Sequence, residues 1–257
     1  MALRNQWSPV CLSVHYGQRH EKELLAAKKL AAHLKLEHWI IPLSLPWGGS
    51  ALTDNQISVP KGRSEGEMTK EIPSTYVPAR NSILLSLAAS LAETKGAEAV
   101  YFGANALDYS GYPDCRPEFI EAFEEMIKRG TKTGTKHPIQ VVAPLLRMTK
   151  AEIVKLGSQL KVPFEWTWSC YDGKEFPCGE CDSCILRAKG FREAGIEDPL
   201  SLRAPRSGEK QSQVSGIASP LPVEGTVKGI LISPEAGGVR ASASLGTLPR
   251  NDGKRYA

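Results

Sequence analysis

Long apolar runs are absent from this 257-residue sequence, in which no stretch of 18 or more apolar residues occurs. We therefore expect no membrane-spanning helix. The first nine residues contain a single arginine and no apolar segment typical of a secretory signal peptide, so we expect a cytoplasmic protein. Without an export signal, a disulfide framework is also not expected.

Excess charge of one sign is missing from most of the chain. Residues 1–200 contain 24 Lys and Arg and 24 Asp and Glu, whereas residues 201–257 contain eight basic and four acidic residues and account for the net charge of +4. A neutral body argues against a broad surface that follows nucleic-acid phosphates. Basic and aromatic residues are also not interleaved, which argues against a tRNA-binding module. We therefore expect neither nucleic acid nor a membrane among the partners of this protein.

Segments with strand character alternate with segments of helical periodicity. The predicted strands are residues 10–14, 39–41, 99–103 and 139–143, and the predicted helices are residues 21–34, 82–94, 118–129, 150–160 and 185–194. This alternation predicts an α/β fold with a doubly wound parallel sheet. Ligands bind at the carboxyl ends of such strands, so we expect the chemistry in the loops after Val14, Ile41, Gly103 and Ala143.

Three regions differ in composition. Residues 1–165 are predicted to form the α/β nucleotide-binding-type domain, with a long loop or lid over residues 42–71, which are rich in Gly, Pro, Ser and Asp. Residues 166–202 form a cysteine-containing module with a final helix. Residues 203–257 are dominated by Ser, Gly, Pro and Val without periodicity, so we expect a disordered tail.

Four of the six cysteines are clustered, in the order Cys170-x7-Cys178-x2-Cys181-x2-Cys184. Zinc prefers four thiolates at the corners of a tetrahedron, and Cys-x2-Cys turns bring two sulfurs to one ion. Four thiolates fill the coordination sphere, so this spacing predicts a structural Zn²⁺ site. The alternatives are an iron–sulfur cluster, which also uses four thiolates, and four unrelated buried cysteines.

Four segments have the character of motifs. They are Ser-Val-His-Tyr-Gly-Gln-Arg-His at 13–20, Tyr-Val-Pro-Ala-Arg-Asn at 76–81, Gly-Ala-Asn-Ala-Leu-Asp-Tyr-Ser-Gly-Tyr-Pro-Asp-Cys-Arg-Pro at 103–117, and Thr-Trp-Ser-Cys-Tyr at 167–171. Together with the cysteine cluster, these segments resemble the 7-cyano-7-deazaguanine synthase family. The resemblance covers roughly residues 10–200 in unbroken order, and the segment at 103–117 is its most specific part.

The resemblance implies a PP-loop ATP-pyrophosphatase fold, a homodimer, and an ATP-dependent ligase of queuosine biosynthesis that uses ATP, Mg²⁺ and structural zinc. Such an enzyme converts 7-carboxy-7-deazaguanine and ammonia into 7-cyano-7-deazaguanine. The implied order is adenylation of the carboxylate, attack by ammonia to give an amide, and then activation and dehydration of the amide to a nitrile.

The sequence departs from the family pattern at one place. The family opens with a strand and a Ser-Gly-Gly-x-Asp-Ser loop that cradles the ATP phosphates through backbone N–H groups. This sequence enters the pattern at the second strand, and Gly48-Gly49-Ser50 lies outside a strand–loop–helix context. Three explanations are open, namely a misassigned start, a truncated and catalytically inactive member that retains the zinc module, or a partner chain that supplies the loop. His15 also stands where the family commonly has Asp.

The resemblance places Arg80 and Asn81 near the nucleotide, whereas the plainer alternative is that they cap a helix. Arg80 is the better candidate because a guanidinium pairs with phosphate or carboxylate in a bidentate manner.

The segment at 103–117 contains our candidate substrate-binding residues. We hypothesise that Asp108 or Asp114 binds the N–H and amino edge of the deazaguanine and that Arg116 pairs with its carboxylate. Tyr109 and Tyr112 are candidates for stacking on the heterocycle. The alternatives are turn-forming Asp residues, a surface Arg and core tyrosines. We assign no catalytic residue.

Overall fold

The structure is a computed structural model, and it describes residues 1–19, 21–105, 112–172, 175–200 and 230–234. The strands are β1 (Val10–His15), β2 (His38–Pro42), β3 (Ala97–Tyr101), β4 (Gln140–Val142) and β5 (Ile230–Pro234). The α-helices are α1 (Lys22–His33), α2 (Glu65–Met68), α3 (Arg80–Lys95), α4 (Pro117–Gly130), α5 (Lys150–Gln159) and α6 (Asp182–Ala194), with 3₁₀ turns η1 (Leu3–Asn5), η2 (Pro113–Cys115) and η3 (Phe164–Trp166).

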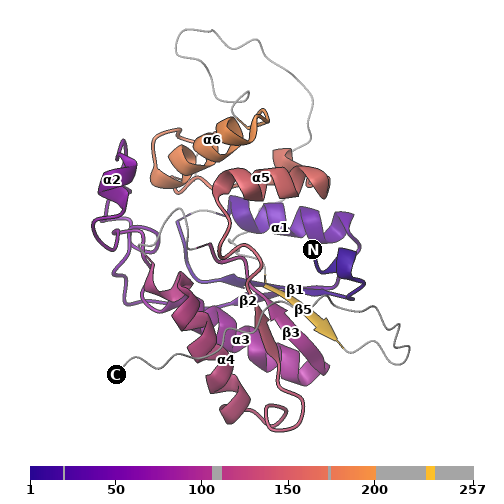
Figure 1. The fold of residues 1–257 in the computed structure, drawn as a ribbon. Helices are drawn as coiled ribbons and strands as arrows, with labels where there is room; N and C mark the ends of the chain where they lie inside the picture. Colours follow the sequence, from indigo (N-terminus) through magenta and orange to yellow (C-terminus); the bar gives the residue numbers. More distant parts are fainter. Residues whose placement is uncertain (20, 106–111, 173–174, 201–229, 235–257) are drawn as a thin grey trace, which may run out of the picture.

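The strands form one five-stranded sheet in the order β2-β1-β5-β3-β4. The pairs β1–β2 and β3–β4 are parallel, as the alternating pattern predicts. Helices cover both faces, with α3 and α4 on one side and α1, α5 and α6 on the other (Figure 1). The predicted segments for β1 to β4, for α1 and for α3 to α6 are confirmed to within a few residues at their ends.

β5 differs from the prediction of a parallel sheet, because it lies between β1 and β3 and runs antiparallel to both. Its residues belong to the stretch 203–257, for which we predicted no strand. A run of Ile-Leu-Ile is favourable in strands. The ladder hydrogen bonds of β5 satisfy the facing backbone edges of β1 and β3, which an open sheet would leave unpaired.

Local sequence signals explain where α5 begins and where α6 ends. The Thr149 hydroxyl accepts a hydrogen bond from the Glu152 N–H at 3.2 Å, while the Glu152 carboxylate accepts one from the Thr149 N–H at 2.8 Å. These two hydrogen bonds form a capping box, which fixes the start of α5. α6 ends at Gly195, whose φ of 70° is the left-handed conformation favoured by glycine at a helix C-terminus.

The main core lies between the sheet and its helices. Leu12 of β1 and Leu85 of α3 are fully buried, and Val100 and Phe102 on and after β3 are 1% exposed. The apolar face of α4 adds Ile120, Phe123 and Ile127 to the same cluster. This packing sets the carboxyl ends of β1 and β3 in one plane, from which the loops of the candidate site emerge.

Close packing of α6 on α5 depends on Gly190. A Cβ atom at position 190 would lie 2.6 Å from the Lys150 Cβ, which is nearer than two carbon atoms can approach. We predict that Gly190→Ala lowers the free energy of unfolding by roughly 1–3 kcal/mol, because the two helices must separate.

Gly130→Ala is the matched control for Gly190→Ala, because Gly130 closes α4 and its added Cβ would meet nothing within 4 Å. Urea unfolding should show little change or a small gain for this control. Equal stabilities of the two variants would contradict the close approach of α5 and α6.

Candidate functional site

The four clustered cysteines converge on one point. The Sγ atoms of Cys170, Cys178, Cys181 and Cys184 all lie within 4.8 Å of one another. Thiolates that bind one zinc ion at about 2.3 Å in a tetrahedron are about 3.8 Å apart, so this arrangement is compatible with a four-cysteine metal site. Three of the four side chains are buried, and Cys178 is partly exposed.

Backbone geometry brings the sulfurs together. Gly179 has a φ of 76°, which allows the tight turn between Cys178 and Cys181. The N–H of Cys181 donates to the Cys178 sulfur and the N–H of Cys178 donates to the Cys170 sulfur, both at 3.3 Å. Cys181 is the N-cap of α6, and Cys184 follows in its first turn. Amide donors and a helix N-terminus both favour the thiolate form that binds metal.

The thiols compete for protons within the cluster. Hydrogen bonds from Cys181 and Cys184, followed by the N–H groups of Cys178 and Asp172, lower the pKa of Cys170. The hydrogen bond with Cys170 raises the pKa of Cys181 to about 12, and the pKa of Cys184 is raised by both neighbours. The thiols of Cys170, Cys181 and Cys184 therefore share protons, which a divalent cation would displace on binding.

The cluster is fastened to the long loop between β2 and α2. Lys61 forms a β-bridge with Cys181, and the Gly62 N–H donates to the Glu180 carbonyl at 2.8 Å. Arg63 forms an ion pair with the buried Asp182. Residues 61–63 of the predicted lid at 42–71 thus contact the cysteine module.

A cavity of about 420 Å³ lies beside the cluster, at the carboxyl end of β3, and we call it the polar cavity because charged side chains stand among its mainly apolar lining. One wall consists of Ser169, Tyr171 and Ser183, which are chain neighbours of Cys170 and Cys184. The remaining polar lining residues are Glu23 of α1, Asn105, Tyr112 and Cys115 after β3, Lys150 of α5, Thr167 and Trp168 after η3, and Arg187 of α6. The cysteine cluster therefore positions one wall of this cavity.

Asn105 joins the loop after β3 to the loop before α5. Its amide Nδ2 donates to the carbonyls of Leu145 and Met148 at 3.0 and 2.6 Å, and its Oδ1 accepts a hydrogen bond from the Lys150 ammonium. Arg187 is held differently, because its Nε and Nη2 donate to the two carboxylate oxygens of Asp198 at 2.6 and 2.8 Å. The cavity is thus lined by side chains that hydrogen bonds hold in place.

The predicted nucleotide-binding pair occupies the first two positions of α3, whose N-cap is Ala79, so the alternative that these residues cap the helix is wrong. The Arg80 side chain is buried, and its Nη1 donates to the Tyr16 hydroxyl at 3.3 Å. Asn81 is fully buried, and its Nδ2 donates to the Asp114 carbonyl at 3.0 Å and to the Cys115 sulfur at 3.2 Å. Neither residue is among those lining the polar cavity. Their contact with nucleotide stays a prediction.

The predicted substrate-binding residues lie in different surroundings. Asp108 and Tyr109 are outside the described residues. The Asp114 carboxylate is buried and accepts a hydrogen bond from the Asn81 backbone N–H at 3.0 Å, which ties η2 to the start of α3. Arg116 is exposed at the N-cap of α4. Substrate contact by Asp114 and Arg116 stays a prediction.

Tyr112 and Cys115 line the polar cavity, as does Asn105. The Tyr112 hydroxyl is hydrogen-bonded to Thr75 at 2.8 Å, and its ring packs on Tyr76 with centroids 6.0 Å apart. We did not identify Asn105, Lys150 or Glu23 as site residues from the sequence. The sequence did contain a signal for Asn105 and Lys150, because both residues follow strands whose carboxyl ends were expected to carry the chemistry.

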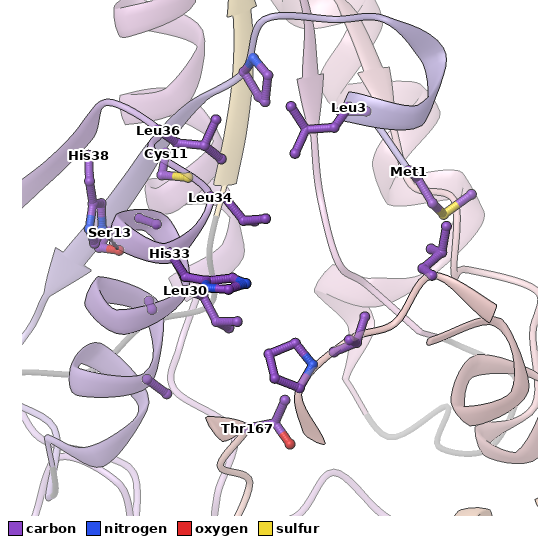
Figure 2. Close-up of a pocket in the computed structure, with 18 of the residues that line it drawn as sticks. Met1, Leu3, Cys11, Ser13, Leu30, His33, Leu34, Leu36, His38 and Thr167 are labelled. Carbon is purple, nitrogen blue, oxygen red and sulfur yellow. Dashed lines mark hydrogen bonds between the residues drawn. The ribbon is translucent and has the colours of Figure 1, made fainter. Parts of the chain in front are cut away.

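A second, mainly apolar cavity of about 580 Å³ lies between β1, β2, α1 and the start of the chain (Figure 2). The Ser13 hydroxyl and the His38 Nε2 are hydrogen-bonded there at 2.6 Å. Burial raises the pKa of the neighbouring Cys11 thiol to about 11, so Cys11 is protonated and unreactive near neutral pH. Burial and, to a smaller extent, Lys28 lower the pKa of His38.

Comparison with known proteins connects this arrangement to one family. The model of the family described as queuosine biosynthesis protein QueC matches residues 1–195. The chain belongs to the QueC family. The resemblance that the sequence motifs indicated is thereby confirmed.

Curated relatives of this QueC-family chain are named 7-cyano-7-deazaguanine synthase. The one from Anaeromyxobacter dehalogenans is 55% identical over 193 residues, which are 74% of this chain and 82% of the relative. The one from Trichodesmium erythraeum is 54% identical over 192 residues, covering 74% and 86% of the two chains. The one from Thermoplasma volcanium is 51% identical over 200 residues, covering 77% and 82%.

None of the described helices has the length and apolar composition needed to cross a membrane.

Asp114 offers a test of the contact between η2 and α3 in this QueC-family chain. We predict that Asp114→Ala lowers the free energy of unfolding by about 1–3 kcal/mol, because it leaves the buried Asn81 N–H without its acceptor. Asp114→Asn keeps a side-chain carbonyl oxygen and should lose less. Urea denaturation of both variants measures this difference, and wild-type stability of Asp114→Ala would show that the contact is unimportant.

Proposed function

We propose that this chain catalyses the ATP-dependent conversion of 7-carboxy-7-deazaguanine and ammonia into 7-cyano-7-deazaguanine for queuosine biosynthesis. The observation that carries this proposal is the identity of 51–55% to relatives that bear the name of that synthase. The same identity favours an active enzyme over the inactive, truncated alternative. The polar cavity beside the cysteine cluster supplies a site of suitable size, since pockets for small molecules begin at about 300 Å³.

We further propose that the cysteine cluster holds a structural Zn²⁺ ion. Cys170, Cys178, Cys181 and Cys184 would provide four thiolates, which complete a tetrahedral shell and leave no open position for substrate. The ion would then act by holding the wall at residues 169–171 and 183 against the cavity. The C-terminal module and the α/β domain would remain one functional unit through the Arg63–Asp182 ion pair.

In this proposal, the cofactors, the cavity walls and Arg80 would contribute differently to the reaction. ATP and Mg²⁺ would supply activation of the substrate carboxylate. The walls of the cavity would orient the heterocycle and exclude water from the activated acid, so that ammonia rather than water attacks it. Arg80 remains our candidate for a nucleotide contact, because its buried guanidinium lies at the N-terminus of α3, where anions are favoured.

The fold would be of the PP-loop type, and the parallel pairs β1–β2 and β3–β4 would belong to its sheet. The motif Ser-Gly-Gly-x-Asp-Ser does not occur in the 257 residues. Among these 257 residues, Arg80 and Asn81 remain the candidates for contact with ATP, and the homodimer stays what the family resemblance implies.

Metal analysis tests the zinc proposal. The purified chain should contain about one zinc per molecule, and Cys178→Ser or Cys184→Ser should remove most of it, because three thiolates bind zinc far more weakly than four. Cys11→Ser is the matched control, since Cys11 lies on β1 outside the cluster, and it should keep its zinc. Iron and sulfide in the purified chain, or zinc retained by both cluster variants, would contradict the proposal.

Calorimetry with ATP and Mg²⁺, followed by an assay of nitrile formation by mass spectrometry, tests the enzymatic proposal. We expect the zinc-containing chain to bind ATP and to form 7-cyano-7-deazaguanine from the 7-carboxy compound and ammonium. A folded, zinc-containing chain that neither binds ATP nor forms the nitrile would refute the activity and leave only the family membership.

A further inference from the structure

One tryptophan lies where the polar cavity and the apolar cavity adjoin. Trp168 follows η3, and it is among the residues that line both the polar cavity and the apolar cavity between β1, β2 and α1. The chain contains five tryptophans, and in the described part of the polar cavity Trp168 is the one that belongs to the lining. An indole has a large, flat and apolar surface, so Trp168 offers the polar cavity an aromatic wall.

The Trp168 ring is held in place by three contacts. Its indole N–H donates to the Cys170 carbonyl at 3.0 Å, and the side chain packs against the cluster of buried cysteines. The Lys22 ammonium lies 4.4 Å from the ring centroid and donates to the Glu175 carbonyl at 2.5 Å. Lys22 therefore connects the ring to α1 and to the cysteine module. A ring held in this way loses little conformational freedom when a ligand packs on it.

Two phenylalanines of the same lining are engaged in the packing between helices. The rings of Phe164 and Phe191 lie edge to face with centroids 5.0 Å apart. The Phe164 ring also lies against α5, since a Cβ atom at Gly157 would come within 2.6 Å of the Phe164 Cζ. A ligand could stack on these two rings only if they left this packing, whereas Trp168 already lies between two open volumes.

The substrate of the proposed reaction has a flat bicyclic core. Stacking on an aromatic side chain uses the face of a heterocycle, so it depends little on the groups attached to the rim of the ring. 7-Carboxy-7-deazaguanine and 7-cyano-7-deazaguanine share this core and differ at position 7. An aromatic wall should therefore contribute equally to the binding of both compounds.

We infer that the deazaguanine heterocycle stacks on the Trp168 ring, which makes Trp168 a specificity-determining residue of the polar cavity. This inference rests on the proposed function. It adds Trp168 to Tyr109 and Tyr112, the candidates for stacking that the sequence indicated. It also places the stacking surface next to the cysteine module, through the hydrogen bond to the Cys170 carbonyl.

Calorimetry with the full zinc-containing chain tests the inference by measuring the affinities for the carboxy and the cyano compound. Trp168→Leu removes the aromatic face and should weaken both compounds roughly 5- to 100-fold, as expected for one base stacked on one aromatic side chain. Trp168→Phe keeps an aromatic face but removes the indole N–H, and it should weaken both compounds by less than about threefold.

Trp166 provides the matched control. The Lys29 ammonium lies 4.2 Å from the centroid of the Trp166 ring, an arrangement like that of Lys22 and Trp168. Trp166 is not among the described residues that line either cavity. Trp166→Leu should therefore leave the affinities for both compounds unchanged.

Tryptophan fluorescence provides a second readout, which also applies if Trp168→Leu does not fold. A heterocycle that stacks on an indole quenches its emission, so 7-carboxy-7-deazaguanine should quench the wild-type chain. Trp166→Phe should keep this quenching. Trp168→Phe should bind the compound in calorimetry without the quenching, because the stacked ring is then a phenyl group.

The outcomes distinguish the inference from the proposed function. If Trp168→Leu and Trp168→Phe lose affinity equally, Trp168 acts through its hydrogen bond to Cys170, and the inference is wrong while the function stands. The inference is also wrong if the quenching persists in Trp168→Phe, or if the variants weaken only ATP, because adenine is then the stacked ring. If the wild-type chain binds neither deazaguanine, the proposed function itself fails, and the inference fails with it.

Discussion

The convergence of four cysteine sulfurs is the constraint on which the candidate site depends. Cys170 follows η3, and Cys181 and Cys184 begin α6, so one cluster joins the segment after α5 to the last helix. The same cluster fixes Ser169, Tyr171 and Ser183 as one wall of the polar cavity. Without a common ligand, the thiols of Cys170, Cys181 and Cys184 compete for protons, and a bound cation would remove that competition. Binding of a metal would therefore be coupled to the geometry of the cavity wall.

The sheet supplies the opposite side of the site. Its two parallel pairs direct the loops after β1 and β3 toward the same edge, and Asn105 then links the loop after β3 to Lys150 of α5. β5 holds the two pairs together as an antiparallel central strand. The site thus lies between a sheet edge, whose register is fixed by backbone pairing, and a cysteine module, whose position is fixed by sulfur geometry and by the Arg63–Asp182 ion pair.

Features that depend on local sequence patterns could be predicted from the sequence. Helical periodicity predicted α1 and α3 to α6. The cysteine spacing predicted the cluster. Features that depend on contacts between distant segments were not predictable in this way. The Asn105–Lys150 hydrogen bond joins residues 45 positions apart, and the bond between the Asn81 N–H and Asp114 spans 33 positions. β5 was missed because a short apolar run in a tail of low complexity has no periodicity that predicts its partner strands.

We propose that the cysteine cluster, with zinc bound, positions one wall of the cavity that would hold the substrate. The most direct measurement is the affinity for 7-carboxy-7-deazaguanine of the zinc-containing chain, of the chain stripped of zinc by a chelator, and of the stripped chain after one equivalent of zinc is restored. Circular dichroism would establish that the stripped chain keeps its helices and strands. We expect the affinity for 7-carboxy-7-deazaguanine to fall at least about tenfold when zinc is stripped and to return when zinc is restored. An unchanged affinity in a folded, zinc-free chain would contradict it.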